Sequence, residues 1–102
     1  MAILHTVNKS PFERNALTTC LRLAAKGSTI LFIEDGVIAA TKGSKFSQVV
    51  TGALGDYKFC FLNPDAEARG LKSDDMIDGV DSIDYAGFVD LVVGHDAVKA
   101  WL

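Results

Sequence analysis

The sequence predicts a small three-layer α/β domain with a mainly parallel sheet of four or five strands, flavodoxin-like or Rossmann-like in outline. Short apolar segments rich in β-branched residues recur along the chain, and segments with helical features separate them. Alternation at this spacing implies right-handed β-α-β crossovers, which give a parallel sheet. The 102 residues suffice for one modest core, so we expect a single domain over residues 1–102.

The strands are predicted where apolar runs are bounded by turn residues. Runs such as AILHTV and STILFI are typical of strands that are buried on both faces of a sheet. The last run, VKAWL, is predicted to form an edge strand. The predicted strands cover residues 2–7, 28–33, 57–62, 80–84 and 98–102.

The first helix has the strongest local signal in the sequence. Ser10 suits the N-cap, Pro11 the first helical position and Glu13 the reciprocal position of a capping box. The helix is predicted to run over residues 11–26 and to end at Gly27, a favourable residue just beyond a helix.

The later helical segments are shorter. A turn at 34–36 is followed by VIAAT, which suits a helical turn, and the glycine within residues 47–54 predicts a weak helix there. Gly70 closes a short helix over residues 65–69, and residues 85–94 form a mostly apolar helix.

Composition excludes several classes of function. The net charge is −3 and the isoelectric point is about 5.1, so no basic surface indicates direct nucleic-acid binding. No signal-peptide pattern or membrane-length apolar run is present, which predicts a cytoplasmic protein. The two cysteines lie 40 residues apart, outside any metal-ligand pattern, and are expected to be thiols without a structural metal. The 49% apolar share suits burial against other subunits as well as an internal core.

Candidate polar residues fall in loops that follow the predicted strands, where ligands bind in open α/β sheets. Glu34 and Asp35 form either a carboxylate pair for acid–base or Mg²⁺ chemistry or an ordinary Asp-Gly turn, and the turn is favoured. His5 is expected to satisfy a hydrogen bond within its strand, and His95 to interact with a helix end. No glycine-rich phosphate loop of known spacing is present.

The two cysteines differ in their predicted surroundings. Cys60 lies between aromatic residues in a strand, where burial would raise its pKa and keep it inert. Cys20 lies on the apolar arc of the first helix, too far from the N-terminus for a strong dipole effect. Core packing is therefore favoured for Cys20, unless this arc faces another subunit. The other residues of the arc are Ala16, Leu17, Leu21 and Ala24.

Four segments together resemble a known family over essentially the whole chain. They are LHTVNKSPFERNALTTCLRLAAKG, ILFIEDGVIAA, FLNPDAEARGL and IDYAGFVDLVVGHDAVKAW, and they follow in that order. This combination resembles the DsrH/TusB family of the DsrE/DsrF/DsrH superfamily, and is most similar to DsrH-type members of intracellular sulfur oxidation.

The resemblance implies a DsrE/F/H-like α/β fold and a role in sulfur relay. Such subunits assemble with DsrE-like and DsrF-like subunits into a heterohexamer with two copies of each. The DsrH branch passes persulfide sulfur to a DsrC/TusE-like carrier during cytoplasmic sulfur oxidation. The TusB branch serves 2-thiouridine formation at the tRNA wobble position. Neither role implies a metal or an organic cofactor.

The resemblance also makes Cys20 a candidate persulfide site, because DsrH-type members carry a cysteine in the first helix. The principal sulfur-carrying cysteine of the superfamily corresponds to one in the DsrE/TusD subunit, so Cys20 would be accessory. The first alternative is a structural subunit with both thiols silent. The second is a flavodoxin-like ligand-binding domain that uses Asp35. For either subunit role, Phe88, Leu91 and Val92 of the apolar helix form a candidate packing surface.

Overall fold

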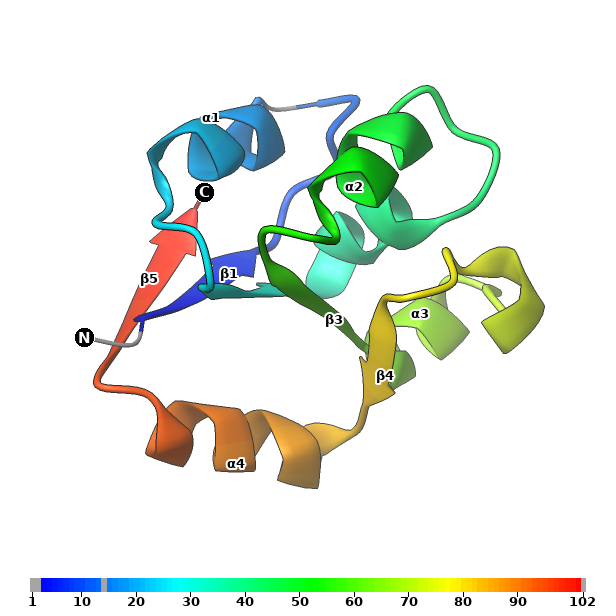
Figure 1. The fold of residues 1–102 in the computed structure, drawn as a ribbon. Coiled ribbons are helices and arrows are strands. Elements are labelled where there is room, and N and C mark those ends of the chain that lie inside the picture. Colours follow the sequence, from blue (N-terminus) through cyan, green and yellow to red (C-terminus); the bar gives the residue numbers. More distant parts are fainter. Residues whose placement is uncertain (1–2, 14, 102) are drawn as a thin grey trace.

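The fold is built on a five-stranded sheet in which every neighbouring pair of strands is parallel (Figure 1). The computed structural model describes residues 3–13 and 15–101, so Ala2 and Leu102, both predicted in strands, lie outside the described residues. The strand order is β4-β3-β2-β1-β5, which confirms the predicted parallel α/β class. The strands are β1 (Ile3–Val7), β2 (Thr29–Phe32), β3 (Lys58–Leu62), β4 (Asp81–Ile83) and β5 (Ala97–Trp101).

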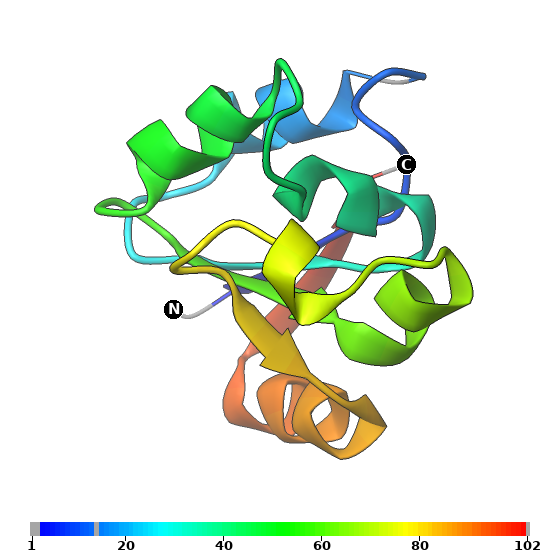
Figure 2. The ribbon, with the colours of Figure 1, turned by 90° about the vertical axis from the view of Figure 1, so that its right-hand side faces the viewer.

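The helices form one layer on each side of the sheet (Figures 1 and 2). One side carries α1, α2 and the 3₁₀ helix η1, with α3 beside η1, whereas α4 alone crosses the other side. The predicted three layers are therefore confirmed. The helical elements are α1 (Ala16–Leu23), η1 (Glu34–Ala40), α2 (Ser47–Ala53), α3 (Asn63–Ala68), η2 (Ser73–Asp75) and α4 (Tyr85–Gly94).

The predicted start of the first helix at Pro11 is wrong. Ser10 does perform cap chemistry, because its Oγ accepts a hydrogen bond from Phe12 N and its carbonyl oxygen accepts one from Glu13 N. These bonds close a separate turn, and α1 begins only at Ala16. Arg14 lies outside the described residues. The predicted capping residue, Ser10, therefore closes a turn that precedes the helix.

The predicted end of this helix at Lys26 is also wrong. Ala24 is already extended, and α1 ends at Leu23. The hydroxyl of Tyr57 lies 3.0 Å from the carbonyl oxygens of both Leu21 and Ala24, and so satisfies acceptors that a longer helix would have used. Gly27 has φ +91° and serves the following turn instead of capping the helix.

The short helix over Asn63–Ala68 ends as predicted. Gly70 has φ +75°, and its N–H and that of Leu71 donate to the carbonyls of Glu67 and Ala66. A left-handed glycine with this pair of bonds is a common way to end a helix. The last helix, α4, has the predicted bounds, and Asp84 caps it by accepting a 2.8 Å hydrogen bond from Gly87 N.

The sheet separates a large core from a small one. The large core lies between the sheet and α1, η1 and α2, and contains Cys20 among its buried residues. The small core lies between the sheet and α4, and its buried members are Leu4, Leu31 and Cys60. The two cysteines therefore lie on opposite faces of the sheet.

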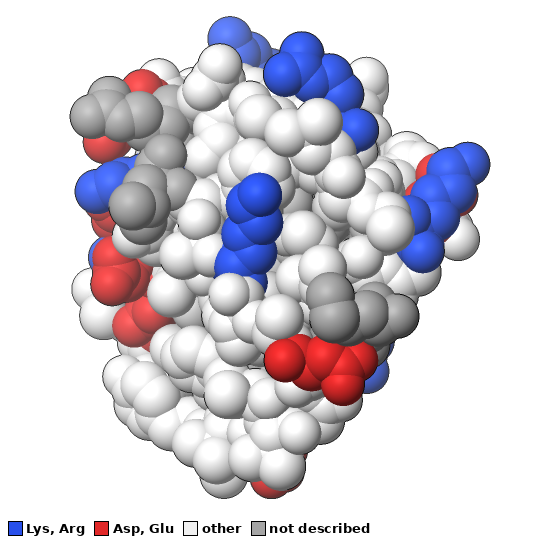
Figure 3. All heavy atoms as spheres, turned by 90° about the vertical axis from the view of Figure 1, so that its left-hand side faces the viewer, with Lys and Arg blue, Asp and Glu red and all other residues white. Residues whose placement is uncertain are grey.

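Helix α4 has an inward and an outward apolar side. Phe88 and Leu91 pack inward against the small core, so the sequence-based expectation that these two residues form an external packing surface is wrong. Of the three residues named for that surface, only Val92 is substantially exposed, at 41%. In Figure 3 the lower part of the molecule, where Figure 1 places α4, is mostly free of charged atoms.

Candidate functional site

The strand order reverses beside β1. The chain adds β2, β3 and β4 on one side of β1, and α4 then crosses the sheet to place β5 on the other side. Open α/β sheets bind ligands at the carboxyl ends of the strands where the order reverses. Val7 and Trp101 are paired at this point, which we call the β1/β5 crossover.

Three side chains from the two crossover strands lie together on the α1 side of the sheet. His5 is paired with Lys99 across the two strands. Trp101 Nε1–H donates a 3.0 Å hydrogen bond to His5 Nδ1, and Lys99 Nζ lies 4.6 Å from the centre of the Trp101 ring. The indole is thus held on one edge by a hydrogen bond and on one face by a cation.

Cys20 of α1 belongs to the core on the same side. Its side chain is 0% exposed, and the predicted partners of its apolar arc are buried or partly buried with it. Burial raises the pKa of the Cys20 thiol to about 11, and the charge of Lys99 acts in the opposite direction. The thiol is therefore protonated and unreactive at neutral pH in the isolated chain.

The burial of Cys20 confirms the core packing that the sequence favoured. The alternative, in which the apolar arc of α1 leaves the thiol at a surface that another subunit covers, does not hold for the thiol, because the chain itself covers it. Trp101 is partly exposed at the end of an edge strand and packs against the cluster that contains Cys20. The indole therefore forms part of the boundary of this core, on the strand that contacts α1.

His5 satisfies a hydrogen bond within the fold, as predicted. It is 4% exposed, and burial together with the charge of Lys99 lowers its pKa. A neutral ring with a free lone pair on Nδ1 is the form that accepts the Trp101 N–H. The histidine thus fixes the position of the indole.

Asn8 follows β1 at the same edge of the sheet. Its Oδ1 is buried and lacks a hydrogen-bond partner, the one such side-chain atom among residues 3–13 and 15–101. Buried polar atoms are normally paired. The crossover therefore offers an acceptor that a bound group or partner would satisfy.

Glu34 and Asp35 do not form a free carboxylate pair. Asp35 Oδ1 accepts 2.9 Å bonds from both Nε and Nη2 of Arg69, and the backbone N–H of Glu34 donates to Asp65 Oδ2. Residues 34–36, predicted as an Asp-Gly turn that ends the strand, instead form the start of η1, which these bonds tie to α3. Within the described part of the chain, no group of three or more His, Cys, Asp or Glu side chains is placed to hold a metal ion.

Cys60 is buried in the smaller core, as predicted. It is 1% exposed, and burial raises the pKa of its thiol. The charges of Lys58 and Asp81 act on that pKa in opposite directions. The charge of Lys58 favours the Cys60 thiolate, and the charge of Asp81 opposes it.

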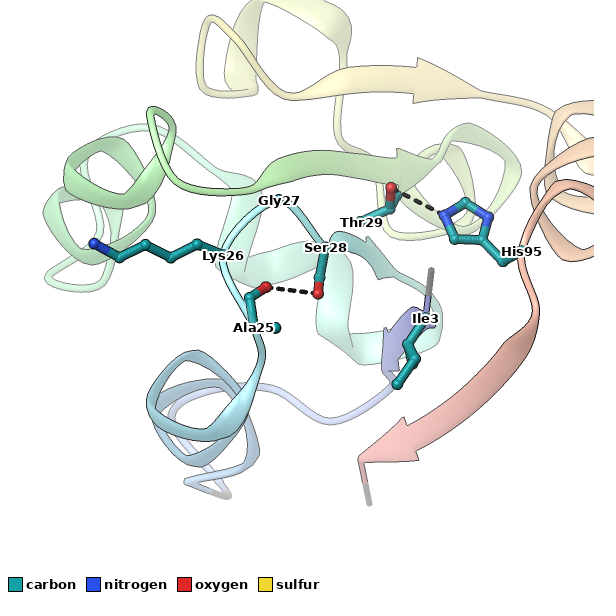
Figure 4. Close-up of a pocket in the computed structure, with 7 residues that line it drawn as sticks. All are labelled: Ile3, Ala25, Lys26, Gly27, Ser28, Thr29 and His95. Atoms are coloured by element: carbon teal, nitrogen blue, oxygen red, sulfur yellow. Dashed lines mark hydrogen bonds between the residues drawn. The ribbon is translucent and has the colours of Figure 1, made fainter. Parts of the chain in front are cut away.

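A pocket of about 350 Å³ lies at the opposite edge of the sheet, where the strands begin (Figure 4). Its polar groups already have partners: Ser28 Oγ donates to Ala25 O, and His95 Nε2 lies 3.2 Å from Thr29 Oγ1. His95 Nδ1 donates to the carbonyl of Leu91 at the end of α4, which confirms its predicted helix-end position. Lys26 extends away from the other lining residues in the view of Figure 4.

Two residues of the β1/β5 crossover were not predicted as site residues from the sequence. Lys99 and Trp101 are two residues apart in the predicted last strand, so they share a face of the sheet. Only the strand order places that face beside Cys20 and His5, and the sequence does not specify which edge the last strand joins. Among the described residues, no helix has the length and apolar character needed to cross a membrane.

The fold is shared with two solved structures. The ychN protein from E. coli superposes with a TM-score of 0.86 at 19% identity, covering 98% of each chain. A protein of Methanobacterium thermoautotrophicum, MTH1491, gives 0.73 at 18% identity, covering 96% of this chain and 97% of that one. At these identities the likeness concerns the fold alone.

Sequence comparison gives the family. TusB of Photorhabdus laumondii is 39% identical over 100 residues, and TusB of Escherichia coli O81 is 38% identical over 102 residues. Each alignment covers 97% of this chain and 100% of the relative. The model of the family described as "DsrH like protein" matches residues 9–98. The chain therefore belongs to the DsrH-like family, which confirms the resemblance seen in its sequence motifs.

Proposed function

We propose that the chain is a subunit of a cytoplasmic DsrE–DsrF–DsrH-type sulfur-relay complex, and that Cys20 is an accessory persulfide site within it. The complex would be a heterohexamer with two copies each of this chain, a DsrE-like subunit and a DsrF-like subunit. The principal sulfur-carrying cysteine would belong to the DsrE-like partner. A DsrC/TusE-like protein would receive the sulfur.

The observation that carries the role of Cys20 is the contact of α1 with β5, the strand that bears Lys99 and Trp101. The thiol lies in the core against which Trp101 packs, and the charge of Lys99 favours its thiolate. Movement of one indole at the end of an edge strand would open a path to the thiol.

The proposed transfer conserves atoms and electrons. The Cys20 sulfur attacks the outer sulfur of a donor persulfide, forming the new S–S bond as the donor S–S bond breaks. The Cys20 proton passes to the departing donor thiolate, so the products are the Cys20 persulfide and a donor thiol. The same exchange with the carrier cysteine returns Cys20 to its thiol. Two thiol–persulfide exchanges need no oxidant or reductant.

The reconstituted complex tests this role. Sulfur arriving at the carrier cysteine is followed by mass spectrometry with wild-type chain, with Cys20→Ala and with the matched Cys60→Ala variant. We expect Cys20→Ala to slow the arrival of sulfur and Cys60→Ala to leave it unchanged. Equal rates for all three would favour the alternative, a structural subunit in which burial keeps both thiols silent.

Two pathways remain as destinations for the sulfur. DsrH-like motifs favour the oxidation of stored sulfur, whereas the identity to TusB proteins favours 2-thiouridine formation in tRNA. We favour sulfur oxidation because the first helix carries Cys20, as in DsrH-type members. Deletion of the chain should then stop the consumption of stored sulfur. Loss of wobble 2-thiouridine with normal sulfur consumption would assign it to the tRNA branch.

A further inference from the structure

The hydrogen bond between Trp101 and His5 joins the end of the last strand to the middle of the first. Trp101 Nε1–H donates to His5 Nδ1 over 3.0 Å, and the two ring centres lie 6.1 Å apart. His5 lies within β1, which has a neighbouring strand on each side, and its side chain is buried. Trp101 is the last residue of β5, an edge strand. The bond therefore ties a peripheral side chain to a fixed one.

Strand β5 has few other attachments to the rest of the fold. It pairs with β1 along one edge only, and four of its five residues are exposed. Within residues 97–101, the indole of Trp101 is the one side chain that packs against a hydrophobic core. The position of the indole therefore governs how the end of β5 is held beside α1.

The bond requires one protonation state of His5. A ring nitrogen that accepts a hydrogen bond must carry a lone pair, so Nδ1 is unprotonated and the neutral ring carries its proton on Nε2. The imidazolium form carries a proton on both nitrogens, and the indole N–H can only donate. Protonation of Nδ1 would therefore set two donors against each other and break the bond.

The charges around His5 oppose its protonation in the closed arrangement. Lys99 of β5 is paired with His5, and its positive charge acts on the ring. On the other side, β2 contributes no ionisable residue. Helix α1 contributes the neutral thiol of Cys20 and the exposed cation Arg22. No carboxylate side chain comes from β1, β2, β5 or α1, so none of these elements would stabilise an imidazolium at this position.

We propose that the His5–Trp101 hydrogen bond is a proton-controlled latch, in which uptake of a proton by His5 releases the indole and the end of β5 from the sheet. The proton comes from solvent, and the only bond lost is the hydrogen bond between the two rings. Release opens the boundary of the large core beside α1. The latch is a property of the isolated chain, so it holds or fails independently of the sulfur-relay function proposed above.

The direction of the response follows from the two states of the ring. In the closed state, burial and the charge of Lys99 lower the pKa of His5 from its ordinary value of 6.5. A released, hydrated ring returns toward that ordinary value, so the released state binds the proton more readily. The latch is therefore closed at neutral pH, and the released fraction grows as the pH falls below about 6.5.

Tryptophan fluorescence tests the latch directly, because the chain contains one tryptophan and two histidines. Acrylamide quenching measures exposure of the indole, and this quencher is uncharged. Between about pH 7.5 and about pH 5, we expect the quenching constant to rise about twofold or more in the wild type. It should stay constant in His5→Gln. His95→Gln is the matched control and should behave as the wild type, because His95 bonds to Thr29 and Leu91 at the other edge of the sheet.

A second variant tests the electrostatic part and serves if His5→Gln does not fold. Lys99→Met removes the charge that opposes protonation, so the midpoint of the rise should move to higher pH, whereas Lys99→Arg should keep it. Circular dichroism follows the fold of every variant. The latch would be overturned by a wild type whose quenching does not change with pH, by an equal rise in His5→Gln, or by an unchanged midpoint in Lys99→Met. A rise that accompanies loss of the far-ultraviolet signal would also overturn it, because the whole fold would then be opening.

Discussion

Cys20 of α1 and Cys60 of β3 are both buried, and in both cases burial raises the pKa of the thiol. They differ in what lies around them. Cys20 lies near Lys99, in a core that ends at the partly exposed Trp101. Cys60 lies beneath α4, between charges of opposite sign. Burial alone therefore does not distinguish the two cysteines. The neighbouring charges do, and on that difference we base the proposal that Cys20 is the accessory persulfide site.

The largest predicted effect is a loss of stability in alkaline solution, which follows from the raised pKa of the two buried thiols. The pKa of Cys20 is about 11 in the folded chain against an ordinary value of 9.0, so the unfolded chain loses its proton first. The stabilisation is complete below pH 9 and is lost as the pH rises toward 11, at a cost of roughly 2–3 kcal/mol. Urea denaturation measures this fall.

The Cys20→Ala variant isolates that contribution. Its free energy of unfolding should decline less steeply with pH than that of the wild type, although alanine lowers its stability at neutral pH. Cys60→Ala should also flatten the curve, since the pKa of Cys60 is raised in the same direction. Parallel curves for wild type and Cys20→Ala would show that the thiol is not desolvated.

The next prediction tests whether Trp101 shields Cys20 from solvent. Trp101→Ala should raise the rate of Cys20 alkylation by about tenfold, which corresponds to about 1.4 kcal/mol in the free energy of exposing the thiol. The rate at Cys60 should stay constant, because its cover is α4. Trp101→Phe, which keeps a ring but loses the hydrogen bond to His5, should give an intermediate rate. An equal rise at both cysteines would indicate general loosening of the fold instead.

A smaller predicted effect tests how the charges near Cys20 and Cys60 differ. In the Trp101→Ala background, Lys99→Met should slow the alkylation of Cys20 by roughly threefold, because the thiolate loses a nearby positive charge. Lys99→Arg keeps the charge and should keep the rate. Lys58→Met should slow only Cys60. If Lys99→Met leaves the alkylation rate of Cys20 unchanged, the charge of Lys99 does not act on the thiol.

The smallest effect concerns the histidine that holds the indole. Because the pKa of His5 is lowered by burial and by Lys99, the unfolded chain takes up its proton first as the pH falls. Stability from neutral His5 is present above about pH 6.5 and is lost below it. Thermal unfolding of wild type and His5→Gln on either side of this pH should show the decline in the wild type only. A decline of equal size in both would exclude His5 as its source.

Part of this structure follows from local sequence and part does not. The bounds of α4 were predictable because Asp84 caps an apolar run that ends before His95, and the buried arc of α1 followed from the spacing of Cys20 and its neighbours. The start of α1 was not, because the Ser10 signal closes a turn of its own. The approach of Lys99 and Trp101 to the side of the sheet that carries Cys20 depends on β5 pairing with β1, a contact between the two ends of the chain that no local pattern encodes.

The most direct test of the account is the distribution of sulfur between the two cysteines. The reconstituted complex is exposed to a persulfide donor, and peptides of this chain are analysed by mass spectrometry. We predict an added sulfur atom on Cys20, more of it in Trp101→Ala, and none on Cys60. Absence of sulfur from Cys20 in the assembled complex, with the partner cysteine loaded, would contradict a role in sulfur transfer and leave the chain a structural subunit.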